Sequence, residues 1–423
     1  MFALGCLFAI HFAVVGAQPG ESTNAATTLL RHGFIGNPYL LPTGPTAHVS
    51  PLLAVYLAAV YAVFGVNTWI ANVALGIVAA AIYAAAAAVT LRSLDFARVS
   101  ASGNWIAIGV LLSTSLVLFY VVAYCRDWEQ PVSALVLVYG WQVFIRFERQ
   151  GARASLVLMM AGLAGVSFLL TPAIMPSLIA GLILMMWRDR RARGSRRRAI
   201  GAVLIVVALA LPWGIRNRLE LGSFILTRSN FGLELAQGNQ PGAQGPSSVG
   251  WTAPIHPSMS MTAALSLRRV GEVRYMADMT ALAIHWIRAD PIRFLSLTAI
   301  RAWLVLIPDR DLVGWYPVIG PTGALLILSA FGALKVLALA ASLIAMVRPL
   351  QCVLFCLLPL APYVVTHVYM RYEIPTYFTT ALMLTIVADA MLTRLNARRR
   401  SAPIPVYAAR AETSAGESRT NPS

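Results

Sequence analysis

Long, continuously apolar segments recur along this chain and are separated by short polar turns. A membrane-spanning helix needs about 20 mostly apolar residues, whereas the strands of a membrane barrel alternate apolar and polar positions. The segments here are continuous, so the pattern predicts helices. Those that could span a membrane are residues 2–17, 68–91, 104–124, 131–147, 154–170, 173–187, 199–213, 323–347, 350–367 and 374–393. We therefore expect an all-α polytopic membrane protein with about 10 transmembrane helices.

One further apolar run, PLLAVYLAAVYAVFG at residues 51–65, has two interpretations. As a helix it would reach about 22 Å, against a hydrocarbon core of about 30 Å. If it lies in the interface, residues 17–50 are external and the chain spans ten times. If it spans, residues 17–50 are cytoplasmic and the chain spans eleven times. The pattern alone leaves both topologies open.

Arginine placement gives the orientation of the remaining segments. Arginine gathers in residues 92–98, 146–153 and 188–198, the last with seven arginines, and in the tail after Met391. Loops rich in Lys and Arg remain in the cytoplasm. Alternating the spans from residue 68 puts all four segments on that side, with Arg348 beside them.

These assignments divide the chain into four parts. Residues 1–213 form a transmembrane module with a first external loop at 17–67. Residues 214–322 form an external region with interfacial helices, because counting a span there would place the C-terminal arginines outside. Residues 323–393 hold the last transmembrane helices. Residues 394–423 are expected to be a disordered cytoplasmic tail.

Composition agrees with this organisation. The 423 residues are 58% hydrophobic and 12% charged, with a mean hydropathy of +0.70. The net charge of +16 would suit nucleic acid, but the arginines lie beside apolar runs, so we expect membrane lipids and no nucleic acid as partners. The four cysteines show no metal-ligand spacing and are expected to pack in the core.

The first loop and the next external turn hold the candidate acids. Glu21 is the one acid among the first 50 residues, and it precedes a proline-rich loop that contains His48. Glu21 could act as a general base at the membrane surface, or be an ordinary N-terminal acid of a helix. Asp127 and Glu129 lie where one span gives way to the next, and acids at a membrane edge are often functional.

Arginines on the external side are the candidate phosphate ligands, because guanidinium groups bind phosphate in a bidentate manner. Arg216 and Arg228 follow a span directly, and Arg371 occupies a short external turn against the positive-inside trend. Amides suit the hydroxyl groups of a sugar. The remaining candidate substrate contacts are Asn217, Asn239, Glu272, Tyr275 and Tyr372. Ordinary phospholipid headgroups are an equal explanation for the arginines after the span.

The order of these motifs resembles the C-type membrane glycosyltransferases, in particular bacterial relatives of protein O-mannosyltransferases and of lipid A aminoarabinose transferase. The resemblance extends from about Glu21 to Ala388. It rests on Glu21 through HGFIGNP, TGPTAHVSP with a short apolar helix, PWGIRN, RSNFGLELAQGNQ, VGEVRYMA and RYEIP before the last span. Relatives commonly carry an Asp-Glu pair in the first loop, where this chain has Gly20-Glu21.

The resemblance implies an inner-membrane enzyme that works on the extracytoplasmic face. Its donor would be a sugar on polyprenyl phosphate, its acceptor a lipid, glycan or protein, and its catalytic base the first-loop acid, here Glu21. Arg216, Arg228 and Arg371 would stabilise the leaving phosphate. This chemistry requires no cofactor. Some relatives bind a divalent cation, but the sequence offers no convincing set of metal ligands.

Two other classes of protein remain open at this point. A lipid or sugar transporter would place charges within its spans, and here Lys335 is nearly the only such charge. A ligase or polymerase of lipid-linked polysaccharide would share the arginines without requiring Glu21. A non-catalytic scaffold is a third alternative, because the Asp of the usual pair is missing.

Overall fold

The computed structural model describes residues 1–13, 20–113, 115–151, 153–245, 253–306 and 320–401. Within these ranges the chain is α-helical and forms no strand, only an isolated bridge between Gly36 and Pro45. This confirms the predicted all-α fold class. The longer helices are α1 (Phe2–Phe12), α2 (Glu21–His32), α3 (Pro51–Phe64), α4 (Trp69–Ala97), α5 (Ala101–Ser113), α6 (Ser115–Tyr124), α7 (Gln130–Gln150), α8 (Ala154–Leu170), α9 (Met175–Asp189), α10 (Ser195–Leu221), α11 (Phe231–Asn239), α13 (Met261–Val270), α14 (Glu272–Ala289), α15 (Pro291–Leu304), α17 (Gly320–Ile344) and α20 (Tyr377–Ser401).

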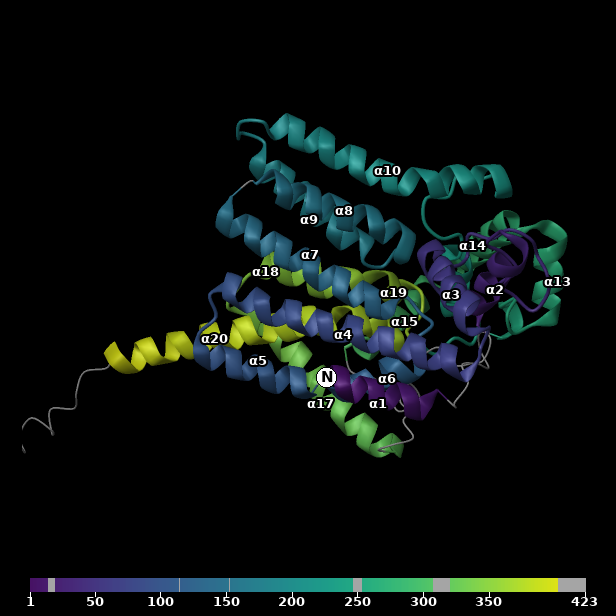
Figure 1. Cartoon of the computed structure of the whole chain (residues 1–423). Helices are drawn as coiled ribbons and strands as arrows, with labels where there is room; N and C mark the ends of the chain where they lie inside the picture. Colours follow the sequence, from purple (N-terminus) through teal and green to yellow (C-terminus); the bar gives the residue numbers. More distant parts are fainter. Residues whose placement is uncertain (14–19, 114, 152, 246–252, 307–319, 402–423) are drawn as a thin grey trace, which may run out of the picture.

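Long helices lie side by side with their axes roughly aligned (Figure 1). α10 packs on α8 at one edge, and α4 packs on α7 and α1 further in. The short helices α2, α3, α13 and α14 gather at one end of this bundle. Between α17 and α20 the chain forms short helical pieces, among them α18 (Pro349–Cys352), α19 (Ala361–Val365) and the 3-10 segment η4 (Met370–Thr376), of which α19 and η4 matter for the site.

Local sequence sets where the short helices begin and end. The Ser50 hydroxyl accepts a hydrogen bond from the Leu53 amide at 3.3 Å, and Pro51 occupies the first turn of α3. α2 ends at Gly33, whose φ of 78° is the left-handed conformation that glycine adopts without strain. The short run predicted at residues 51–65 is thus a capped helix of 14 residues.

The main hydrophobic core lies among α7, α8, α9 and α20. Trp141 on α7 stacks on Phe355 with ring centroids 5.7 Å apart, and its indole nitrogen donates to Gln351 at 2.8 Å. A buried ion pair joins Lys335 on α17 to Glu373 on η4 at 2.8 Å. Burying two charges in this way is tolerated only when they pair, so the contact fixes η4 against α17.

Three helices in the described part of the chain are long and apolar enough to cross a membrane: Trp69–Ala97, Ser195–Leu221 and Arg371–Ala397. Shorter apolar helices are Phe2–Phe12, Pro51–Phe64, Ala154–Leu170, Lys335–Ile344 and Pro349–Val365. The protein is therefore a polytopic helical membrane protein. The total of about 10 spans stays a prediction.

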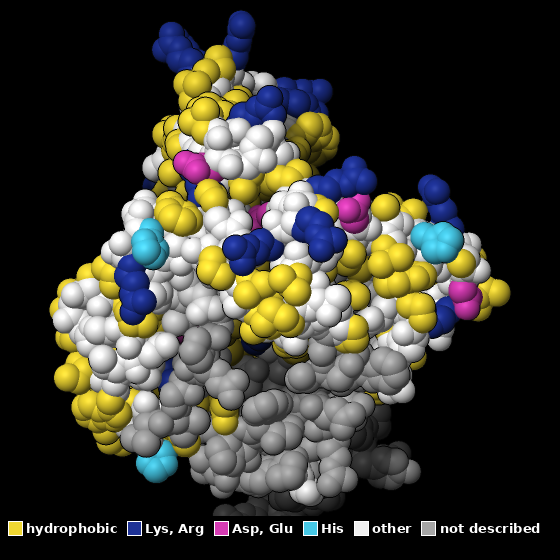
Figure 2. Space-filling view, turned by 90° about the vertical axis from the view of Figure 1, so that its right-hand side faces the viewer, with side chains coloured by type: hydrophobic (Ala, Val, Ile, Leu, Met, Phe, Trp, Pro, Cys, Tyr) yellow, Lys and Arg dark blue, Asp and Glu magenta, His cyan; other side chains and the backbone are white. Residues whose placement is uncertain are grey.

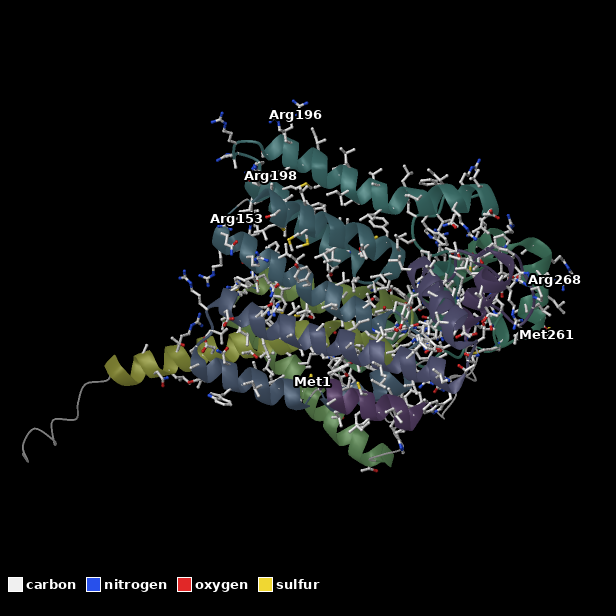
Figure 3. The ribbon with its side chains drawn as sticks, in the orientation of Figure 1. Met1, Arg153, Arg196, Arg198, Met261 and Arg268 are labelled. Carbon is white, nitrogen blue, oxygen red and sulfur yellow. The ribbon has the colours of Figure 1, made fainter. Side chains whose placement is uncertain are left out.

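The arginine-rich loops meet at one end of the bundle. Arg153, Arg196 and Arg198 lie at that end, opposite Met261 and Arg268 on α13 (Figure 3). Contacts agree with the picture, since Glu148 pairs with Arg188 at 2.7 Å and with Arg348 at 3.2 Å. The first loop, with α2 and α3, lies at the opposite end (Figure 1).

Two sequence-based boundaries need comment. α20 continues to Ser401, so residues 394–401 are helical although the tail from 394 was expected to be disordered. Leucine, alanine and arginine favour helix in this stretch. The rest of the tail, 402–423, lies outside the described residues. The region 214–322 contains α11, α13, α14 and α15, whose interfacial position stays a prediction, and its residues 307–319 are not described.

Candidate active site

A cavity of about 810 Å³ opens at the end of the bundle that carries the first loop. Its lining comes from segments far apart in the chain: α2, the proline-rich loop, the turn before α7, α11, the segment around His256 and the segment from Pro362 to Tyr372. Around this end the molecular surface mixes basic side chains with hydrophobic ones (Figure 2). Such a surface suits the boundary between lipid headgroups and water.

One wall of the cavity is centred on Glu21, the first residue of α2. Its Oε2 lies 2.9 Å from Nε2 of His48. Its Oε1 accepts a hydrogen bond from the Ser258 hydroxyl at 2.6 Å and lies 3.4 Å from Nε2 of His256. The carboxylate is therefore enclosed by three polar groups, two of which come from a segment more than 200 residues away in the chain.

The proline-rich loop is rigid, which explains how it holds His48 in place. The Asn37 side chain accepts hydrogen bonds from the amides of Thr43 and Gly44 at 2.9 and 2.8 Å. This closes the loop on itself as an Asx-type turn does. The His48 side chain is only 3% exposed, and its ring packs edge-on against Tyr39 with centroids 5.1 Å apart.

Two predicted site residues support this loop from behind. Glu272 accepts hydrogen bonds from the Thr46 hydroxyl, from the Ala47 amide at 2.8 Å and from the Ser229 hydroxyl at 2.7 Å. Arg216 donates to the carbonyls of Ile35 and Thr46, both at 2.8 Å. Both side chains therefore fix the backbone that carries His48.

Burial and the neighbouring charges shift the pKa values of Glu21, His48 and His256. Burial would raise the pKa of Glu21, but the charges of His48 and His256 and the hydrogen bonds from His48 and Ser258 outweigh it and lower that pKa well below 4.5. Burial would lower the pKa of His48, but the charge and hydrogen bond of Glu21 raise it above 6.5. Burial dominates at His256 and lowers its pKa. The contact between Glu21 and His48 therefore favours the ionised carboxylate and the protonated imidazole.

The same three residues could hold a divalent cation. The candidate ligand atoms of Glu21, His48 and His256 all lie within 4.8 Å of one another. Imidazole and carboxylate groups form the usual three-residue set of catalytic zinc sites, in which each ligand atom lies about 2.0–2.2 Å from the metal. A small closure of the cluster would meet this requirement. The sequence offered no such set, because His256 lies 208 residues after His48.

Two further carboxylates of the cavity lining have basic partners. Arg228 pairs with Glu129 at 2.6 Å and donates to the Leu170 carbonyl at 3.0 Å. His367 pairs with Glu234 on α11 at 3.2 Å. The structure thus brings six of the predicted residues into the lining of one cavity: Glu21, His48, Glu129, Arg228, Arg371 and Tyr372.

Arg371 stands in an aromatic cluster in the lining of this cavity. Its guanidinium carbon lies 4.0 Å from the ring centroid of Trp128 and 4.6 Å from that of Tyr369. Tyr372 stacks on Tyr363 with centroids 4.1 Å apart. These rings line the cavity and hold the cation through its attraction to their faces. Arg371 and Tyr372 therefore both lie where the sequence placed a substrate contact.

The remaining predicted site residues take structural positions. Asn217 is buried and donates to the Ile225 carbonyl at 2.7 Å, and Asn239 donates to the carbonyls of Leu235 and Val365 at 2.8 and 3.1 Å. The Tyr275 hydroxyl donates to the Ile255 carbonyl at 2.8 Å, directly before His256. Asp127 is 6% exposed beside Arg126, and burial raises its pKa.

Sequence reasoning missed His256, Ser258, Glu234 and His367. One signal was available, because the chain has six histidines in all and three of them, His48, His256 and His367, line this cavity. Histidine is an uncommon residue here, so its concentration in external segments pointed to a shared site. The pairing of Glu234 with His367 depends on the packing of α11 and left no trace in the sequence pattern.

Comparison with known proteins gives one distant likeness. The fold is similar to the crystal structure of ArnT from Cupriavidus metallidurans bound to undecaprenyl phosphate, at 13% identity and a TM-score of 0.40, over 92% of this chain and 77% of that chain. No protein-family model and no curated protein matches the sequence. So distant a likeness does not carry a function, which has to rest on the residues of the cavity.

Proposed function

We propose that this chain is a membrane glycosyltransferase that moves a sugar from a polyprenyl-phosphate donor to an acceptor on the extracytoplasmic face. One observation carries the proposal: a single cavity joins the carboxylate of Glu21 to the cationic groups of Arg228 and Arg371. Transfer from a phosphate donor needs both, a base for the acceptor and positive charge for the leaving group.

Arg228 and Arg371 are the proposed phosphate ligands. Both line the cavity that Glu21 also lines, on segments that follow or precede apolar helices. A phosphate placed there would keep its polyprenyl chain near the bilayer while its sugar reached into the cavity. The pairing of Arg228 with Glu129 at 2.6 Å offsets part of the Arg228 charge, and Arg371 would bind the same phosphate from its aromatic surroundings. Arg216 would act indirectly, through the loop carbonyls it binds.

The reaction would be one inverting displacement. An acceptor hydroxyl gives its proton to Glu21, and its oxygen forms a bond to the anomeric carbon. The bond from that carbon to the phosphate oxygen breaks, and the electron pair leaves with the polyprenyl phosphate. The contacts that lower the pKa of Glu21 also weaken it as a base. The acceptor would therefore have to displace Ser258 or His48 from the carboxylate. A divalent cation on Glu21, His48 and His256 would supply Lewis-acid activation to the same step.

Sidedness follows from the arginine loops. The cavity lies at the end of the bundle opposite Arg153, Arg196 and Arg198. If those loops remain in the cytoplasm, the cavity faces outward and the ten-span topology applies. An inner-membrane location and an acceptor in the cell envelope, such as a lipid, glycan or secreted protein, follow from the same reasoning.

The test is turnover of defined donors by the purified protein in lipid nanodiscs. Undecaprenyl phosphate esters of mannose, glucose, galactose and arabinose are supplied with an extract of envelope lipids and proteins, and released undecaprenyl phosphate is measured by mass spectrometry. We expect release by the natural protein and a loss of at least about 100-fold in Glu21→Gln. Arg371→Ala should also lose release.

Asp278→Asn is the matched control, because Asp278 pairs only with the exposed Arg274 on the surface of α14. It should release undecaprenyl phosphate at the natural rate. Equal rates in the natural protein and Glu21→Gln would exclude Glu21 as the base. Release that persists in Glu21→Gln but stops in Arg371→Ala would favour a ligase or polymerase of lipid-linked polysaccharide.

A further inference from the structure

One face of α11 presents two polar side chains to the cavity. Glu234 and Gln237 lie three residues apart, which places them on the same side of the helix. Both line the cavity, on the wall that also holds His367 and Tyr372. Neither side chain takes part in the proton transfer proposed above.

Glu234 is held in a defined orientation but retains capacity to bind. Its Oε2 lies 3.2 Å from Nε2 of His367, and its Oε1 accepts a hydrogen bond from the side-chain amide of Asn230 at 2.8 Å. A carboxylate can accept about four hydrogen bonds. The side chain is 22% exposed, so its remaining lone pairs can reach a ligand in the cavity.

A second observation concerns Gln237, whose side-chain amide nitrogen is buried without a hydrogen-bond partner among the described residues. Its side chain is 4% exposed, and among the described residues its Nε2 has no hydrogen-bond partner. A buried polar group left in this state is unfavourable and uncommon. Rotation of the Gln237 side chain toward the cavity that it lines would bring the amide to a ligand hydroxyl and remove that penalty.

The wall is built to be rigid. Gly238 lies so close to the next segment that a Cβ there would stand 1.6 Å from the Thr366 carbonyl oxygen. Arg301 is fully buried behind this junction and donates to the carbonyls of Gly238 and, at 3.2 Å, Val365. The backbones that carry Glu234 and His367 are thus locked together, as precise recognition requires.

From this geometry we infer that Glu234 and Gln237, backed by His367, form the subsite that binds the hydroxyl groups of the transferred sugar. The inference rests on the proposed function. A sugar offers hydroxyls that both donate and accept, and the wall offers a carboxylate acceptor next to an amide. The rings of Tyr369 and Tyr372 also line the cavity and limit the space open to the sugar.

The experiment measures binding rather than turnover. Purified protein carrying Glu21→Gln, which keeps donors intact, is titrated with undecaprenyl phosphate and with its mannose, glucose, galactose and arabinose esters. The inference predicts at least one ester that binds more tightly than bare undecaprenyl phosphate. Adding Glu234→Gln should weaken the binding of that ester by about 10-fold and leave the affinity for bare undecaprenyl phosphate unchanged. Gln237→Met, of similar size, should act in the same direction.

The outcomes separate the two proposals. The sugar subsite is wrong if bare undecaprenyl phosphate binds and no ester binds more tightly. It is also wrong if Glu234→Gln lowers the affinity for the ester and for the bare lipid equally. In both cases the proposed donor class stands. If undecaprenyl phosphate itself does not bind, the proposed function fails and the subsite with it. Asp278→Asn should change neither affinity. A melting temperature equal to that of the parent shows that Glu234→Gln is folded, and Gln237→Met tests the subsite independently.

Discussion

His48 and Glu21 lie 2.9 Å apart although 27 residues separate them, and the proline-rich loop between them is what brings them together. That loop is closed by Asn37 and supported from behind by Glu272 and Arg216. A rigid polar loop so close to the start of an apolar chain therefore has a purpose: it delivers an imidazole to the first acid of the sequence.

Stability should depend on pH through this pair. The pKa of Glu21 is lowered, so its contribution is present above about 4.5 and is lost as the pH falls through the lower folded value. The pKa of His48 is raised, so its contribution is present below 6.5 and is lost as the pH rises through the higher folded value. We expect Glu21→Gln to lose about 2 kcal/mol between these limits and less at higher pH.

Thermal unfolding of both proteins in detergent with EDTA, from pH 4.5 to 9.5, measures this difference. A gap between the two curves that stays constant over the whole range would mean that the pair is not ionised as described. Asp278→Asn, which removes an exposed carboxylate, should show no such dependence.

A divalent cation should bind at Glu21, His48 and His256. Calorimetric titration of the chelator-treated protein with Zn²⁺ is expected to give one tight site, and saturating Zn²⁺ should raise the melting temperature. His48→Gln and His256→Gln should each weaken binding by at least about 10-fold, because each removes one of three ligands. His285→Gln, which changes an exposed histidine on α14, should bind as the natural protein does. Unchanged affinity in both site variants would rule the cluster out.

A separate prediction concerns the contribution of the Lys335–Glu373 ion pair to the stability of the bundle. Lys335→Met leaves the Glu373 carboxylate buried without its cation and should cost about 3–5 kcal/mol. The double variant Lys335→Met with Glu373→Met should recover most of that loss, since paired apolar side chains carry no uncompensated charge. The free energy of unfolding in detergent is measured for the single and the double variant. A double variant as unstable as the single one would show that the pair acts through packing alone.

Sidedness is checked with single cysteines. In a variant whose Cys6, Cys125, Cys352 and Cys356 are serine, His32→Cys should react with a membrane-impermeant thiol reagent on intact cells. Arg193→Cys should react only after the cells are opened. Both positions are exposed, one at the end of α2 and the other in the arginine loop before α10. The reverse labelling pattern would put the cavity in the cytoplasm and exclude the proposed donor side.

Much of the fold could be predicted because hydrophobic runs and arginine clusters act locally. The runs became helices, and the loops holding Arg153 and Arg196 lie at one end as expected. The site was predictable only in part. Glu21, His48 and Arg371 stood out against an apolar background, whereas the roles of Arg216 and Glu272 depended on which carbonyls and amides the fold placed beside them. His256 was missed because no local pattern links it to Glu21, although the small number of histidines in the chain was a signal.

The contact between Glu21 and Ser258 spans 237 positions of the chain, and this separation orders the events of biosynthesis. α2 leaves the ribosome long before the segment that completes its surroundings, and the aromatic cluster around Arg371 emerges later still. The cavity therefore cannot form until the segment with Arg371 and Tyr372, directly before α20, has been synthesised. A chain that stopped before this segment could insert its earlier apolar helices into the membrane but would lack one part of the cavity lining.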